Sequence, residues 1–252
     1  MRILFVGDVV GKVGRRMVQE HLLKLKKEHG AQIAIVNGEN AAHGKGITEK
    51  IYKELLGYGA DFITLGNHAF QKREIYDLFE RDVRMIRPAN YPEGVPGKGH
   101  QTININGKKL LIMNIQGRSF MPAIDCPFRC VDQILKENEY DYAFVDFHSE
   151  TTSESIAMGY YLDGRVDAVV GTHTHVQTND ETVLENKTKY ITDVGMTGFK
   201  DGILGISKEE VIDRFLHQLP VKHNVPETGK GILSGVIIDT DYHKIEKIKI
   251  TE

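Results

Sequence analysis

The segment ILFVGD, residues 3–8, places a short apolar run directly before a glycine and a carboxylate. Two later segments are similar: IAIVNGEN at residues 33–40 also has a glycine and a carboxylate, and FITLGNH at residues 62–68 has a glycine and an asparagine. Short runs that are mostly apolar and rich in β-branched residues are typical of strands buried on both faces. We therefore predict a buried strand in each segment, followed at its carboxyl end by polar residues.

Amphipathic stretches lie between these predicted strands. Residues 15–28 carry apolar side chains at helical spacing, with lysines on the opposite face. A second helix is predicted at 48–56, because Thr48 can cap its start and Gly57 its end. This alternation of strands and helices favours a parallel sheet with right-handed crossovers. Further helices are predicted at 73–79, 131–136 and 207–219.

Strands and hairpins are predicted in the rest of the chain. Asn106-Gly107 lies between the segments 102–105 and 110–114, and this dipeptide is a strong signal for a hairpin turn. Two more strand pairs are predicted at 181–184 with 190–192 and at 233–238 with 245–250, and single strands at 143–147 and 166–170. Neither a repeat nor a low-complexity linker divides the chain, so we predict a single α/β domain over residues 1–252.

The composition excludes several classes of protein. The chain has 252 residues and a formal net charge of −3, so we expect no stable nucleic-acid binding. Its two cysteines, spaced C-x3-C, fit neither a disulfide framework nor the usual zinc spacing. There is no apolar run of about 18 residues and no signal-peptide pattern at the start. We therefore expect a cytoplasmic protein without a membrane span.

Polar residues follow the predicted strands at their carboxyl ends. In open α/β sheets this edge is where ligands bind. Carboxylate, amide and imidazole side chains would meet there, and these groups suit iron, manganese or zinc. The candidate residues are Asp8, Glu39, Asn40, Asn67, His68, His148, His173 and His175.

Each candidate taken alone has a simpler explanation. Asp8 could cap a helix, and His148 could be a hydrogen-bonded core histidine. Glu39 and Asn40, which precede Gly44, could belong to a turn. The pair His173 and His175 is more informative, because alternate positions of an extended segment lie on the same side. The joint pattern, rather than any one residue, predicts a metal site.

Two other patterns are set aside. The segment GDVVGK at residues 7–12 looks like a phosphate-binding loop, but it lacks the Walker spacing and has Val13 where Ser or Thr would bind magnesium. His43 lies close to Glu39 in the sequence, but we leave it out of the ligand set. Other histidines, such as His223, are also predicted to be ordinary residues.

Taken in order, the blocks G-D, G-E-N, G-N-H, a late single His and G-x-H-x-H resemble a calcineurin-like metallophosphoesterase. The segments GDVVGKVGR, NGENAAHGKGI, LGNHAF and GTHTHVQT are similar to the bacterial YmdB-like branch, as are GRSFMPAIDCPF and TDVGMTG. The resemblance implies a sandwich of two β-sheets flanked by helices. That branch is associated with cyclic nucleotide phosphodiesterase activity.

The resemblance also implies a ligand set. The first motif of the wider superfamily is Asp-x-His, but Val10 stands in the place of that histidine, and Glu39 stands where the second motif has Asp. The simplest way to replace the missing imidazole ligand is for Asn40 to supply an amide oxygen. One metal ion would then take Asp8, Glu39, Asn40 and His175, and the other Glu39, Asn67, His148 and His173, with His68 as the general acid.

The chemistry that the resemblance implies is a metal-dependent hydrolysis. Two divalent or trivalent ions, with iron or manganese expected, would hold a bridging hydroxide that attacks a small phosphodiester. Cyclic nucleotides of the 2',3'- or 3',5'-cyclic AMP type are the expected substrates. The alternatives left open are a phosphomonoesterase or phosphoprotein phosphatase, and a metal-stabilised RNA-associated regulator with little turnover. The sequence does not decide between a monomer and a homo-oligomer.

Overall fold

The computed structural model describes residues 1–81, 83–222 and 224–252, and over these residues the strands form two sheets. The first sheet has the order β11-β12-β1-β2-β3-β4, with β13 also paired to β12. Its strands are β1 (Arg2–Val6), β2 (Ile33–Asn37), β3 (Phe62–Thr64), β4 (Met85–Ile86), β11 (Gly198–Phe199), β12 (Gly231–Asp239) and β13 (Lys244–Thr251).

The second sheet has the order β5-β6-β7-β8-β10-β9. Its strands are β5 (His100–Ile105), β6 (Lys108–Gln116), β7 (Tyr142–His148), β8 (Ala168–Thr172), β9 (Thr182–Val183) and β10 (Lys189–Ile191). The helices are α1 (Gly11–Glu28), α2 (Glu49–Gly57), α3 (Ile75–Phe79), α4 (Pro127–Glu137), α5 (Thr152–Tyr161) and α6 (Lys208–His217).

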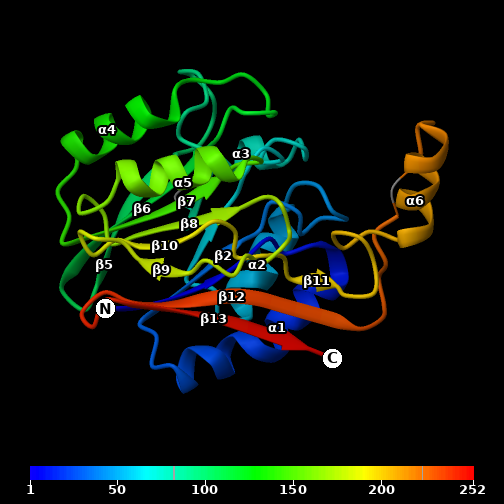
Figure 1. Ribbon diagram of the computed structural model, residues 1–252, viewed down its shortest axis with the longest axis horizontal. Helices are drawn as coiled ribbons and strands as arrows, with labels where there is room; N and C mark the ends of the chain where they lie inside the picture. The colour runs from blue at the N-terminus through cyan, green and yellow to red at the C-terminus, as the bar shows by residue number, and fades with distance from the viewer. Residues whose placement is uncertain (82, 223) are drawn as a thin grey trace.

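The sheets pack face to face, with helices on both outer faces (Figure 1). Side chains from both sheets form the central core, where the rings of Phe5 and Phe144 lie 5.3 Å apart. Helices α1, α2 and α3 cover the outer face of the first sheet, and α4 and α5 that of the second. The predicted α/β sandwich flanked by helices is therefore confirmed. Its single-domain organisation is our proposal, which the shared core supports.

The predicted strands and helices are confirmed, with shifts of a few residues at their ends. Strands β1, β2 and β3 run parallel, as the alternating pattern predicts. Thr48 caps α2, because its hydroxyl oxygen accepts a hydrogen bond from the Ile51 backbone N–H. Asn106 and Gly107 both have positive φ angles and join β5 to β6 in an antiparallel hairpin.

Two features of the second sheet were not predicted. Strands β6, β7, β8 and β10 are also parallel, and helix α5 connects β7 to β8. The sequence of α5 hides the helix, because it buries only Ser155, Met158 and Gly159 while Ile156 and Tyr160 are exposed. Without a regular apolar stripe, helical periodicity is not visible in this segment.

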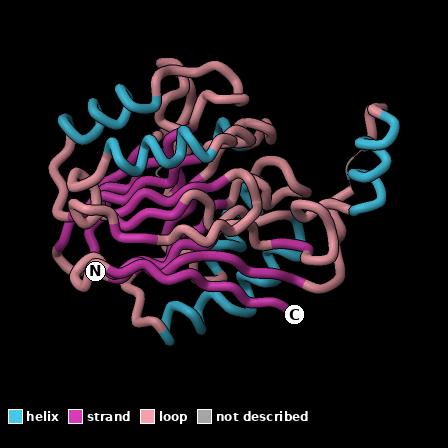
Figure 2. Tube along the Cα trace, viewed as in Figure 1, coloured by secondary structure: helices cyan, strands magenta, loops and turns pink. Residues whose placement is uncertain are grey.

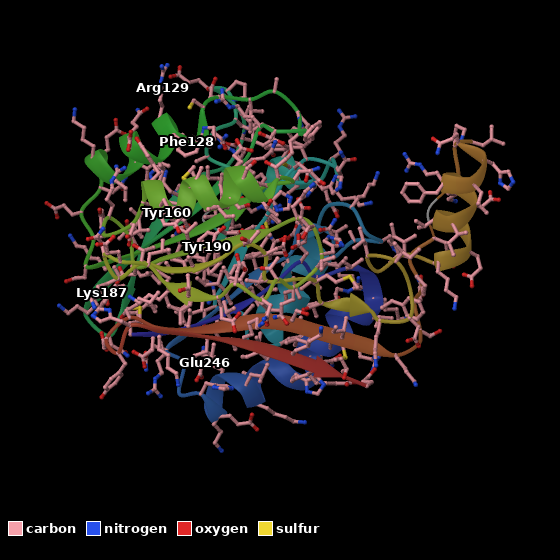
Figure 3. All side chains as sticks on the ribbon, in the orientation of Figure 1. Phe128, Arg129, Tyr160, Lys187, Tyr190 and Glu246 are labelled. Atoms are coloured by element: carbon pink, nitrogen blue, oxygen red, sulfur yellow. The ribbon has the colours of Figure 1, made fainter. Side chains whose placement is uncertain are left out.

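Helix α6 lies apart from both sheets (Figures 1 and 2). Of its residues only Val211 is buried, and in Figure 3 side chains surround this helix on its visible sides. Within the described parts of the chain, no helix combines the length and apolar character needed to cross a membrane.

Candidate metal centre

The carboxyl ends of five strands from both sheets meet at one edge of the sandwich. Asp8 follows β1, Glu39 and Asn40 follow β2, Asn67 and His68 follow β3, His148 ends β7, and His173 and His175 follow β8. The structure brings together the side chains that the sequence analysis selected. Asp8 is not the cap of α1, because the N-cap position of that helix is Val10.

The first group of ligand atoms surrounds the Nε2 atom of His148. This atom lies 2.9 Å from Asn67 Oδ1, 3.2 Å from Glu39 Oε1 and 3.0 Å from His173 Nδ1. One imidazole N–H cannot satisfy two oxygens and a second ring nitrogen at once, whereas a cation can be bound by all of them. The side chains of Glu39, His148 and His173 are close enough to hold a metal ion together.

A hydrogen-bonded chain fixes the orientation of His148. Its Nδ1 lies 2.9 Å from the Thr172 hydroxyl, and that hydroxyl donates to Asp146 Oδ1 at 2.7 Å. Because the Thr172 proton goes to Asp146, its oxygen accepts from His148 Nδ1–H, which leaves the Nε2 lone pair directed at the other ligand atoms. Outer partners of this kind orient metal-binding imidazoles.

The second group of ligand atoms comes from Asp8, Asn40 and His175. The Oδ1 atoms of Asp8 and Asn40 are buried and have no hydrogen-bond partner among the described residues. His175 Nε2 lies 3.9 Å from Asp8 Oδ1, while His175 Nδ1 donates to the Leu204 carbonyl at 3.1 Å. Unpaired buried oxygens are costly. Two such oxygens, with that of Asp8 near the free ring nitrogen of His175, fit a second cation.

The two polar atoms of Asn40 have different surroundings. Its amide nitrogen donates to the Gly44 carbonyl at 2.9 Å and so holds the turn that follows β2. The same hydrogen bond fixes the amide plane and directs Oδ1 away from Gly44. The turn therefore positions the oxygen that is free to bind a cation.

Burial determines the protonation states of the site. It lowers the pKa of His148 to about 4 and that of His173 to about 4, so both imidazoles are neutral at pH 7 and available as ligands. Burial raises the pKa of the Asp8 carboxyl, with the nearby His175 acting in the opposite direction. An unpaired buried carboxylate is unfavourable, and a bound cation would restore its charged form.

The local backbone is adapted to this close packing. A side chain at Gly66 would place its Cβ 2.3 Å from Glu39 Oε2 and 2.5 Å from His148 Nε2, which explains the glycine before Asn67. His173 and His175 both have positive φ angles, of 112° and 64°. Such conformations cost energy in non-glycine residues and are typical of functional sites.

His68 lies next to Glu39, whose Oε2 accepts a hydrogen bond from the His68 backbone N–H at 3.0 Å. The Nδ1 atom of His68 is buried and has no partner in the described structure. Burial also lowers the pKa of His68, a change that Glu39 opposes. His68 is therefore held beside the ligand atoms with a ring nitrogen available for proton transfer.

The sequence analysis missed several residues of the site. Glu150 Oε2 lies 3.0 Å from His173 Nε2, on the side of that ring away from His148. Thr172 and Asp146 orient His148, and Asp146 could have been found because it precedes His148 by two positions and shares its side of β7. His223, which we expected to be an ordinary residue, lies outside the described residues.

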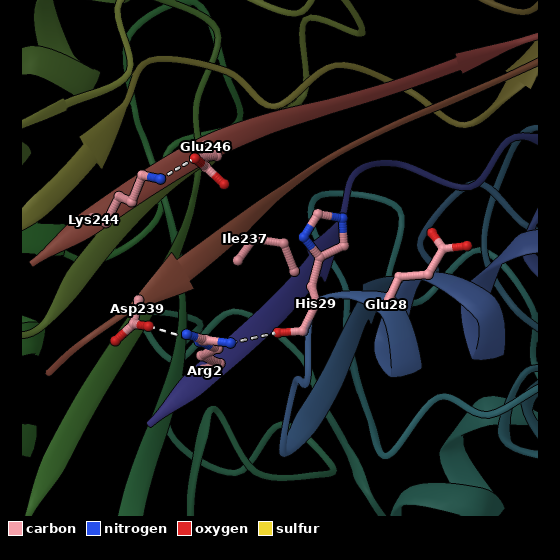
Figure 4. Close-up of a pocket in the computed structure, with 7 residues that line it drawn as sticks. All are labelled: Arg2, Glu28, His29, Ile237, Asp239, Lys244 and Glu246. Atoms are coloured by element: carbon pink, nitrogen blue, oxygen red, sulfur yellow. Dashed lines mark hydrogen bonds and ion pairs between the residues drawn. The ribbon is translucent and has the colours of Figure 1, made fainter. Parts of the chain in front are cut away.

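A small cavity of about 200 Å³ at the opposite, amino end of β1 contains none of these residues (Figure 4). There Arg2 Nε donates to Asp239 at 2.7 Å and Arg2 Nη1 to the His29 carbonyl at 3.2 Å. These bonds join the amino end of β1 to β12 and to the end of α1. We assign this cavity no chemistry.

The two-sheet sandwich, with histidine, carboxylate and amide side chains meeting at its strand ends, defines a phosphoesterase of the metallophosphoesterase type. The family model described as "YmdB-like protein" matches residues 4–252, and the chain belongs to this family. A relative from Bacillus subtilis (strain 168), named 2',3'-cyclic-nucleotide 2'-phosphodiesterase, is 54% identical over 99% of this chain and 95% of its own length.

Two solved structures are similar to this chain. A phosphatase from Mycoplasma pneumoniae is 34% identical with a TM-score of 0.93, over 100% of this chain and 94% of its own. A 5'-nucleotidase precursor from Thermus thermophilus is 12% identical with a TM-score of 0.58, over 100% of this chain and 54% of its own. The second likeness shows the fold alone, and it supports the sandwich assignment.

Proposed function

We propose that the protein is a binuclear metal-dependent phosphodiesterase that hydrolyses cyclic nucleotides. The observation that carries this proposal is the presence of two groups of candidate ligand atoms at one edge of the sandwich. In one group, two oxygens and a ring nitrogen crowd around His148 Nε2, and in the other, the Oδ1 atoms of Asp8 and Asn40 have no partner among the described residues. The name of the Bacillus subtilis relative supports a 2',3'-cyclic nucleotide as substrate.

The two ligand groups fit the proposed assignment of metal ions. One ion would be held by Asp8, Glu39, Asn40 and His175, and the other by Glu39, Asn67, His148 and His173. When bound, the ions would activate water for attack on phosphorus and neutralise the phosphoryl oxygens. Oxygen and imidazole ligands without thiolates favour iron or manganese.

The charge of the ligand set suits a phosphodiester. Asp8 and Glu39 would contribute the two negative charges among the proposed ligands, against four positive charges from two divalent ions. The positive excess attracts a substrate that carries one negative charge. His68 is placed beside Glu39, and we propose that it donates a proton to the leaving oxygen.

The test is a metal analysis of the purified protein followed by a substrate panel. The protein should contain two ions per chain after reconstitution with manganese or iron(II). It should hydrolyse 2',3'-cyclic AMP faster than 3',5'-cyclic AMP and faster than the monoester 3'-AMP. Preference for the monoester would make the protein a phosphomonoesterase. Metal binding without turnover of any of these compounds would instead favour a regulatory protein.

A further inference from the structure

A cavity of about 450 Å³ lies beside the candidate metal centre and shares His175 with it. One wall of the cavity is apolar and consists of Leu204, Ile206 and Val225, from the C-terminal part of the chain. Lys45 and Lys72 also line the cavity. Cavities that bind small molecules have volumes of roughly 300–1,000 Å³, with apolar walls and a few polar groups. This volume can hold a nucleoside.

The apolar wall is fixed relative to the metal ligands. The Leu204 carbonyl accepts the hydrogen bond from His175 Nδ1, so the segment that bears Leu204 also orients a proposed metal ligand. Ile203 and Ile206 pair through two backbone hydrogen bonds of 2.8 and 3.0 Å. A Cβ at Gly44 would lie 2.7 Å from Val225 Cγ2, so Val225 packs closely on the turn that positions Asn40.

Lys45 and Lys72 give the cavity a positive charge. Within the described parts of the chain, neither ammonium group has an ion-pair partner. The turn that carries Lys45 packs against the segment that carries Lys72, because a Cβ at Gly46 would lie 3.1 Å from Lys72 Cγ. A Cβ at Gly46 would also lie 3.4 Å from the His68 carbonyl oxygen, so the turn next to Lys45 packs beside the proposed reaction site.

We propose that this cavity binds the nucleoside of the substrate, with the base against Leu204 and Ile206 and with the lysines facing the phosphate. The inference rests on the proposed phosphodiesterase function and names the part of the substrate that gives specificity. A phosphodiester with no nucleoside would need only the metal centre and would leave the apolar wall uncovered. Burying that wall under a base supplies affinity in proportion to the apolar area removed from water.

The test compares two cyclic phosphodiesters, 2',3'-cyclic AMP and ethylene phosphate, which has the same five-membered ring but no nucleoside. Ile206→Ala and Leu204→Ala should each lower kcat/KM for 2',3'-cyclic AMP about tenfold, because small changes in an apolar pocket have effects of this size. Activity of Ile206→Ala on ethylene phosphate should change less than twofold. The matched control is Ile212→Ala, which removes a similarly exposed apolar side chain outside the cavity.

A direct binding measurement separates this inference from the proposed function. Calorimetry with adenosine in the presence of EDTA needs neither metal nor turnover, and both cavity variants should weaken adenosine binding about tenfold. Thermal melts check that the variants fold, and Leu204→Ala carries little risk because that side chain is 43% exposed. If wild type hydrolyses neither diester, the proposed function fails, and the adenosine result still decides the subsite. Unchanged discrimination between the diesters and unchanged adenosine affinity in both variants would overturn the inference.

Discussion

Replacing Asn40 by alanine should empty one of the two proposed metal sites while leaving the fold intact. The side chain is 4% exposed, and its two polar atoms have separate tasks. The amide nitrogen donates to the Gly44 carbonyl at 2.9 Å, whereas Oδ1 has no partner in the described structure. Asn40→Ala removes both at once, so the two losses must be measured separately.

The two losses differ in size. A neutral hydrogen bond contributes about 1 kcal/mol, so the metal-free protein should lose about that much free energy of unfolding. Changes to residues that only orient metal ligands reduce affinity by about 10–100-fold. Loss of a direct oxygen ligand should therefore cost at least about 100-fold at the ion held by Asp8 and His175, or about 2.8 kcal/mol.

Asn40→Asp offers a sharper comparison. It keeps one oxygen for the cation, but its second oxygen would face the Gly44 carbonyl, and two acceptors in contact repel each other. The added negative charge would also reduce the attraction of the centre for an anionic substrate. We expect near-normal metal content, a raised KM and a destabilised turn.

The assay is metal content after dialysis, combined with urea unfolding in the presence and absence of manganese. Asn90→Ala is the matched control, since Asn90 is equally buried and donates to the carbonyls of Gln116 and Asp125 but lies outside the ligand set. It should lose more stability than Asn40→Ala and keep both ions. Wild-type metal content and kinetics in Asn40→Ala would refute a ligand role and leave Asn40 as a turn residue only.

Three further predictions concern stoichiometry, proton transfer and pH. His148→Ala should lower metal content from two ions to about one per chain, and a single tightly bound ion in wild type would contradict the binuclear assignment. His68→Ala should keep both ions but lower kcat about 10²–10⁴-fold on 2',3'-cyclic AMP and much less on a nitrophenyl diester. Equal losses of kcat on the two substrates, together with reduced metal content, would make His68 a ligand. Hydrogen bonds from Arg16 and the Gly231 N–H lower the pKa of Glu252 to about 2. The Glu252 carboxylate therefore stabilises the fold at pH values above its ordinary pKa, and this stabilisation is lost as the pH falls towards 2. Glu252→Gln should therefore lower the free energy of unfolding, measured with urea, by at most about 1 kcal/mol at pH 7 and should leave it unchanged near pH 2. A difference between variant and wild type that does not depend on pH would contradict this role of the Glu252 carboxylate.

The strands that position the site could be predicted because both of their faces are buried. Ile3 to Val6 pack between a sheet and a helix layer, so each position must be apolar and the run is visible without any structural information. The glycine and polar residue after each strand then mark its carboxyl end. A parallel sheet places such ends at one edge, which is why local patterns predicted a long-range cluster.

Other parts of the site depend on contacts that no local pattern records. Glu150 reaches His173 from the loop after β7, and nothing in its neighbourhood distinguishes it from a solvated surface carboxylate. The parallel order of β6, β7 and β8 was missed because one of its connections is α5, a helix without an apolar stripe. The cavity wall formed by Leu204, Ile206 and Val225 joins the site only through the tertiary fold.

The surroundings of Val10 support the proposed ligand role of Asn40. Val10 is 2% exposed, and its side chain lies against Gly198 and Gly205, where a Cβ would come within 3.0 and 2.9 Å of Val10 carbons. Its backbone N–H donates to the Thr197 carbonyl at 2.8 Å, so the residue is held from both sides. Valine at this position fits against both glycines, borders the cavity of about 450 Å³ and has no lone pair to offer a cation. The proposed ion beside Asp8 would therefore take an oxygen from the turn after β2 instead of a nitrogen from position 10, and an oxygen-rich shell of this kind favours manganese or iron(II) over softer ions.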